Sequence, residues 1–272
     1  MSSEEKKVCF QKKELAGSRF RCLLLTHMGR EKVYEVLREL SKIQKIKIEF
    51  DENKDNYFPK GFTEPKEQML GNIKDEVFNK ILTTSKKREL KRWWLKYIRG
   101  NPSTPNWDFI STCKIDDKPG LFLVEAKAHA AENSSAAKTK NSTTNEDNHE
   151  RIAEAIIEAK NNLEIITDLK FGIQRDRYYQ MSNRFAWTWK LADLGIPVVL
   201  VYLGFLNAKD MEAKGKIMFK NHNDFVASMT KGDPAKIVDP NAWEKKFEVG
   251  DGEKKTPFIA LLRSLECNTF VQ

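Results

Sequence analysis

The sequence predicts an α/β fold in which a mixed central β-sheet is flanked by helices. Segments of helical periodicity lie before and after a pair of strand candidates that are joined by a short turn. A continuous apolar run follows at Val198–Phe205, which is typical of a strand buried on both faces. Helices that alternate with strands in this way cover the two faces of a sheet. The chain has 272 residues and is 40% hydrophobic, which is enough for one large domain with its own core.

The first part of the chain, residues 1–65, predicts an α/β extension packed on the core. Arg21–Thr26 is a short apolar run that we interpret as a strand, and Glu31–Ile43 has the periodicity of a helix. Ile46–Phe50 alternates like a strand. Asp51–Pro65 is rich in Asp, Asn, Gly and Pro, which predicts a loop.

Two helices and two strands are expected next. Apolar residues recur at helical spacing in Lys66–Leu82 and in Ser85–Arg99, and glycine and proline follow the second segment. Trp107–Ile115 and Leu121–Lys127 are the strand candidates. The intervening Lys118-Pro-Gly predicts the turn of a hairpin.

The second half of the chain continues the alternation. Residues 131–148 offer almost nothing to bury and predict a surface loop, with a lid that orders on substrate as the alternative. Helices are expected at Glu150–Ile166 and Tyr178–Leu194, before the apolar strand. The tail, residues 207–272, predicts an addition of short helical and irregular pieces.

Charge and composition limit the partners. The net charge is +8 and the sequence pI is about 9.1, which favours a polyanion without deciding for one. The apolar runs are too short to span a membrane, and the charged first residues do not resemble a signal peptide. We therefore expect a cytoplasmic protein. Its four scattered cysteines form no CxxC pair.

Three polar residues are expected to meet at the end of the hairpin. Glu125 and Lys127 are two apart at the end of an apolar strand, so they share one face while Ala126 points to the other. An acid and a lysine are costly to bury there unless they are paired or bound to something. Asp108 opens the preceding strand, and the hairpin brings it beside Glu125.

This set suits metal-assisted cleavage of a phosphodiester. Magnesium prefers oxygen ligands and keeps several waters, so Asp108, Glu125 and the Ala126 backbone carbonyl are sufficient candidates to hold it. The metal would lower the pKa of a bound water. Lys127 would orient that water or stabilise the transition state.

The residues Asn106-Trp107-Asp108-Phe109, followed by a strand, a turn and Val124-Glu125-Ala126-Lys127, resemble the PD-(D/E)XK nuclease superfamily. The resemblance covers residues 66–206 and implies a restriction endonuclease-like core. It also implies hydrolysis of DNA, occasionally RNA, with Mg²⁺ or Mn²⁺. Asp108 matches the first acid of the family, Glu125 the second and Lys127 the lysine. Trp107 stands where the family name has proline.

The resemblance also suggests supporting residues. Many family members add an acid from the helix before the first motif strand. Glu76 is the slightly preferred candidate and Glu89 the other, although the pattern favours an ordinary surface glutamate for either one. Basic residues interleaved with tryptophans on Ser85–Arg99 suit phosphate contact, or else form a solvated face. The residues expected to contact nucleic acid are Lys91, Arg92, Gln180 and Arg184.

Two other functions stay open. One is a nucleic-acid-binding protein that keeps the nuclease fold without cleaving. The other is a soluble interaction protein of α/β class, in which Glu125 and Lys127 form a structural ion pair. The sequence leaves the choice between DNA and RNA undecided, and also the oligomeric state, a homodimer included.

Overall fold

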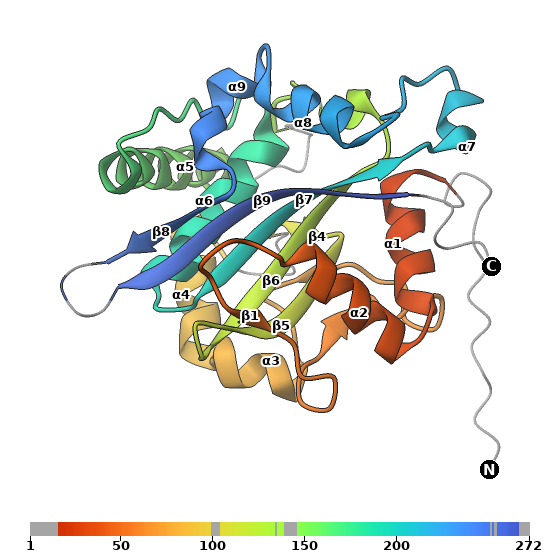
Figure 1. Cartoon of the computed structure of the whole chain (residues 1–272). Coiled ribbons are helices and arrows are strands. Elements are labelled where there is room, and N and C mark those ends of the chain that lie inside the picture. The colour runs from red at the N-terminus through yellow and green to blue at the C-terminus, as the bar shows by residue number, and fades with distance from the viewer. Residues whose placement is uncertain are drawn as a thin grey trace.

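A curled sheet lies between two layers of helices in the computed structural model of the chain (Figure 1). The structure describes residues 16–98, 104–133, 135–138, 146–250, 252 and 255–266. The helices are α1 (Gly17–His27), α2 (Arg30–Leu40), α3 (Glu76–Ile81), α4 (Thr84–Trp94), α5 (Glu146–Thr167), α6 (Tyr179–Asp193), α7 (Lys209–Glu212), α8 (His222–Thr230) and α9 (Pro234–Ile237). The strands are β1 (Ile48–Glu49), β2 (Tyr57–Phe58), β3 (Gln68–Met69), β4 (Asn106–Trp107), β5 (Phe109–Ile115), β6 (Lys118–Lys127), β7 (Val198–Leu206), β8 (Lys245–Val249) and β9 (Thr256–Glu266). The predicted α/β class, with a mixed sheet flanked by helices, is confirmed.

The sheet combines antiparallel and parallel pairs in the order β1-β5-β6-β7-β9-β8, and β2 also pairs with β5. The strands β5 and β6 form an antiparallel hairpin, whereas β6 with β7 and β7 with β9 are parallel. The hairpin turn is Asp116–Asp117, with φ of 47° and 64°, and Ile115 pairs with Lys118. Two central residues with positive φ match the twist of a hairpin, and Asp tolerates that conformation. The turn therefore precedes the predicted Lys118-Pro-Gly, whose residues belong to β6.

Alternate residues of β6 serve two separate cores. Phe122, Val124 and Ala126 face α1 and α2, whose buried residues join the same cluster. Leu121 and Leu123 face the opposite layer, which contains α4, α5 and α6 (Figure 1). This alternation decides which side chains can enter a site on either face of the strand.

Three local predictions are wrong. Arg21–Thr26 lies inside helix α1, because a short apolar run fits a buried helix as well as a strand. The expected helix Lys66–Leu82 is replaced by strand β3, a loop and the six-residue α3. The tail is not only helical and irregular, since β8 and β9 lie there and β9 pairs along the whole of β7.

The predicted loop Asp51–Pro65 contains the short strand β2, which pairs with β5, and the other elements match their predictions more closely. Helices α2, α5 and α6 and strands β5, β6 and β7 lie on the expected segments. Helix α4 ends at Trp94, earlier than predicted, and the described residues 95–98 that follow are not helical. In the loop predicted at 131–148, residues 134 and 139–145 lie outside the described residues, as do 1–15 and 267–272 at the two ends. Within the described parts, no helix is long and apolar enough to span a membrane.

Candidate functional site

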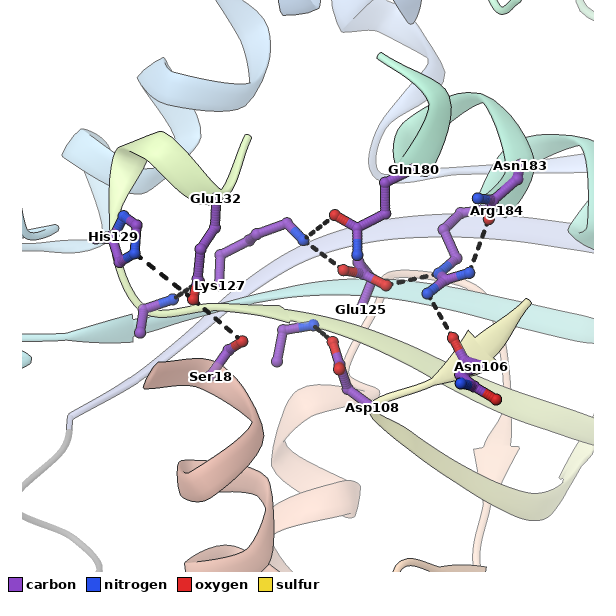
Figure 2. A network of polar contacts seen from close by, with 12 residues as sticks. Ser18, Asn106, Asp108, Glu125, Lys127, His129, Glu132, Gln180, Asn183 and Arg184 are labelled. Atoms are coloured by element: carbon purple, nitrogen blue, oxygen red, sulfur yellow. Dashed lines mark hydrogen bonds and ion pairs between the residues drawn. The ribbon is translucent and has the colours of Figure 1, made fainter. Parts of the chain in front are cut away.

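Glu125 and Lys127 project from the end of β6 towards helix α6 (Figure 2). Both are almost fully buried, and Ala126 between them points into the opposite core. The predicted strand parity is therefore confirmed. The apolar residues that precede them on β6 bury the strand, which forces these two charges to find polar partners.

The Glu125 carboxylate lies between two cations. One oxygen, Oε1, accepts from the Lys127 ammonium, and Oε2 accepts from Arg184 Nε at 2.6 Å. Burial by itself would raise the pKa of Glu125, but Arg184 and Lys127 outweigh it and hold that pKa below its ordinary value. Glu125 is therefore a stable anion inside the protein.

Arg184 is turned inwards and has a protein partner at each guanidinium nitrogen. Besides Glu125, it donates from Nη1 to Asn183 Oδ1 at 2.7 Å and from Nη2 to the Asn106 carbonyl at 2.6 Å. Its guanidinium carbon lies 4.5 Å from the centre of the Trp107 ring. The sequence suggested that Arg184 holds a phosphate of the nucleic acid, whereas in the structure it ties α6 to Glu125 and to β4.

Asp108 occupies the bend between β4 and β5, across from the end of β6. Its Oδ2 accepts from the Ala126 backbone N–H at 2.7 Å, and Oδ1 has no hydrogen-bond partner among the described residues. Burial and, next, the charge of Glu125 raise the pKa of Asp108 well above its ordinary value. The hairpin therefore brings Asp108 to the two residues of β6 as predicted, and leaves it with an oxygen that can accept a further ligand.

The Ala126 carbonyl lies on the Asp108 side of β6. The N–H and the C=O of a strand residue point to the same neighbour, and the Ala126 N–H points to Asp108. Successive residues of a strand direct these groups to opposite sides. Leu121, five residues before Ala126, donates its N–H to the Pro197 carbonyl on the β7 side, as this alternation requires. Asp108 and the Ala126 carbonyl can thus contribute oxygen ligands to one position.

Glu67 is an acid near the site that the sequence did not suggest. In the antiparallel ribbon of β3 and β4, Gln68 is paired with Trp107. The preceding residue, Glu67, is therefore opposite the following residue, Asp108. Burial raises the pKa of Glu67, and the charge of Glu125 adds to this although Arg19 opposes it. No local pattern marked Glu67, because its segment had the periodicity of a helix.

The other two acids considered from the sequence lie elsewhere. Glu76 is exposed in the first turn of α3. Glu89 lines a surface groove of about 570 Å³ together with Arg92, Trp93 and Lys190.

Lys127 has a second partner on helix α6. Its ammonium donates to Gln180 Oε1 at 2.8 Å as well as to Glu125 (Figure 2). Gln180 is itself exposed, so this side of the site reaches the surface. The predicted nucleic-acid contact Gln180 therefore belongs to the same cluster as the predicted catalytic residues.

Lys91 and Arg92 are not part of this cluster. Arg92 is exposed and lines the groove between α4, α5 and α6, and the Lys91 side chain packs against Gly71. Lys190, in the same groove, lies about 15 Å along α6 from Gln180 at the rise of a helix. A nucleic acid that contacts Arg92 and also reaches Asp108 and Glu125 would have to extend over this length of α6.

The donor set fits a magnesium ion bound mainly by water. In the described parts of the chain, no three His, Cys, Asp or Glu side chains come together as a metal-binding group. Magnesium needs fewer, since one or two carboxylates with waters and a substrate oxygen are sufficient. The Oδ1 of Asp108, which has no hydrogen-bond partner among the described residues, is the feature that such an ion would satisfy.

Comparison of the chain with protein-family models, with curated proteins and with solved structures finds no match.

Proposed function

We propose that the protein is a magnesium-dependent nuclease that hydrolyses phosphodiester bonds, with DNA as the expected substrate. The observation that carries the proposal is the convergence of Asp108, Glu125 and Lys127, with an open carboxylate oxygen on Asp108. Two acids and a lysine that meet at one end of a hairpin are the groups that this chemistry requires.

The order of the elements supports a restriction endonuclease-like core. One acid immediately precedes β5 and the other lies on β6 of the antiparallel hairpin, and helices α5 and α6 then lead to β7, which runs parallel to β6. Helix α6 returns over the end of β6 and supplies Gln180 and Arg184. This arrangement agrees with the resemblance to PD-(D/E)XK nucleases that the motif residues suggest.

Each residue has a separate task in the proposed reaction. Asp108, Glu125 and the Ala126 carbonyl would hold the Mg²⁺, which when bound lowers the pKa of a water ligand and offsets charge on the phosphate. Lys127 would direct its ammonium to the attacking water or to the phosphoryl oxygens. Gln180 keeps the Lys127 side chain at the site through its 2.8 Å hydrogen bond.

One observation favours a second candidate, a soluble interaction protein without catalysis. Both oxygens of Glu125 are already paired with cations, which is how a structural ion pair would look. The open Oδ1 of Asp108 weighs against it, because a purely structural network gains nothing from a carboxylate that is only half paired.

A cleavage assay separates these candidates. Purified protein is incubated with single- and double-stranded DNA and RNA in Mg²⁺, Mn²⁺ or EDTA. We expect metal-dependent products that fall about 100- to 1,000-fold in Asp108→Asn and Lys127→Met. Glu154→Gln is the matched control, since Glu154 forms an exposed pair with Arg151 on α5.

Four outcomes would contradict the proposal. Cleavage that persists in EDTA, or that Asp108→Asn leaves at the level of the control, would exclude the metal site. Binding of nucleic acid without cleavage in either metal would favour the non-cleaving protein. If the protein neither binds nor cleaves nucleic acid, the interaction protein would be favoured.

A further inference from the structure

Arg184 is a permanent positive charge inside the acidic site. Its side chain is 5% exposed, and the Glu125 side chain that it contacts is 1% exposed. Each of its three nitrogens is bonded, to Glu125, Asn183 and the Asn106 carbonyl, and its plane lies over Trp107. A guanidinium keeps its charge at any pH a protein tolerates, so this cation is built into the site.

The acids of the site differ in how they are neutralised. Glu125 has two cations, Lys127 and Arg184, on its two oxygens. The partly exposed Glu67 has Arg19 at 3.5 Å. Asp108 is hydrogen-bonded only to a backbone N–H among the described residues. Asp108 is only partly buried and forms no ion pair among the described residues, so it is the acid of the site with an oxygen open to a further cation.

We propose that Arg184 is a positioning residue that takes the place of a second cation at Glu125, so that the site binds one divalent ion, beside Asp108, and not two. This inference rests on the proposed nuclease function and specifies its metal requirement. Arg184 also fixes the geometry, because one side chain joins Glu125 to the backbone of β4 just before Asp108. Lysine could supply the charge at Glu125 but not the fork that reaches three partners.

Calorimetric titration of metal-free protein with Mn²⁺ tests the proposal. We expect one Mn²⁺ per wild-type chain, and no binding at this site in Asp108→Asn. In Arg184→Gln, Glu125 loses a cation, and a charge at this distance changes the proton affinity of a carboxylate by about tenfold or more. We therefore expect Mn²⁺ to bind about tenfold tighter or a second ion to bind, while cleavage becomes slower. Arg184→Lys should bind one ion with an affinity close to that of wild type.

Several results would overturn the proposal. Two ions in the wild type would do so, as would Mn²⁺ binding no tighter to a folded Arg184→Gln. A loss of DNA affinity in Arg184→Gln with unchanged metal affinity would make Arg184 a phosphate contact. If Arg184→Gln does not fold, the proposal is still tested by the number of Mn²⁺ ions that the wild type binds and by the Mn²⁺ affinity of Arg184→Lys. If the protein cleaves and binds two ions, only this inference is refuted. If no Mn²⁺ binding depends on Asp108 and the protein does not cleave, the proposed function is refuted as well.

Discussion

Replacing Glu125 by glutamine should strongly destabilise the protein even in the absence of metal. The change leaves the buried ammonium of Lys127 and the buried guanidinium of Arg184 without their common anion. Removing one partner of a buried ion pair costs about 3–5 kcal/mol, and two charge-assisted hydrogen bonds give a similar sum. Arg184 keeps its bonds to Asn183 and Asn106, so we expect no more than this range. For a chain of this size, that lowers the Tm by roughly 6–20 °C.

Thermal and urea unfolding in EDTA, at pH values from 3 to 8, measure this effect. Although burial opposes it, Arg184 and Lys127 hold the pKa of Glu125 below its unfolded value, so its contribution is complete above about pH 4.3 and is lost as the pH falls through the folded pKa. The difference between wild type and Glu125→Gln should therefore shrink at the acidic end. The exposed control Glu154→Gln should change stability by less than about 0.5 kcal/mol. A Tm within about 2 °C of wild type at pH 7 would refute the account of a buried, doubly paired anion.

Three other substitutions test separate features. Asp108→Asn keeps an oxygen for the Ala126 N–H and removes a charge that burial and Glu125 disfavour, so in EDTA at pH 8 urea unfolding should show equal or higher stability. That gain should vanish by about pH 3, below the unfolded pKa of about 3.9, where the carboxyl is protonated in both states. A clear loss of stability at pH 8 would contradict it. Tyr202→Phe removes a buried hydroxyl with no hydrogen-bond partner among the described residues. The free energy of unfolding should change by less than about 0.5 kcal/mol, and a loss above about 1.5 kcal/mol would reveal a partner. Gly204→Ala would put a Cβ 2.4 Å from the Phe225 ring and should cost about 1–3 kcal/mol in the same assay, whereas no loss would mean that α8 packs less closely on β7.

The part of the site that follows from strand geometry could be predicted from the sequence. The two-residue period puts Glu125 and Lys127 on one face, and a hairpin returns Asp108 to them whichever residues form its turn. The role of Arg184 could not be predicted in this way. Its spacing on α6 is compatible with an outward phosphate contact, and only the packing of α6 against β4 and β6 turns it towards Glu125.

The wrong predictions in the fold have a common physical cause. Lys66–Leu82 has apolar residues at helical spacing, yet Gln68 and Met69 pair with β4, which is distant in the sequence. Thr256–Glu266 becomes a central strand because it pairs in parallel with β7. In both cases, long-range pairing outweighs local propensity, and no window of neighbouring residues contains that information. Glu67 was missed for this reason, since only the pairing of β3 with β4 places it opposite Asp108.

The place of β9 beside β7 has a consequence for synthesis of the chain. All the residues of the candidate site, and β7 itself, have been made when residues 256–266 are still to be translated. Until then, one edge of β7 has no partner strand, and this strand is apolar along its whole length. Such an unpaired edge can pair with another chain. A nascent or truncated polypeptide that lacks β9 should therefore depend on chaperones to stay soluble, even though every residue proposed for catalysis is already present.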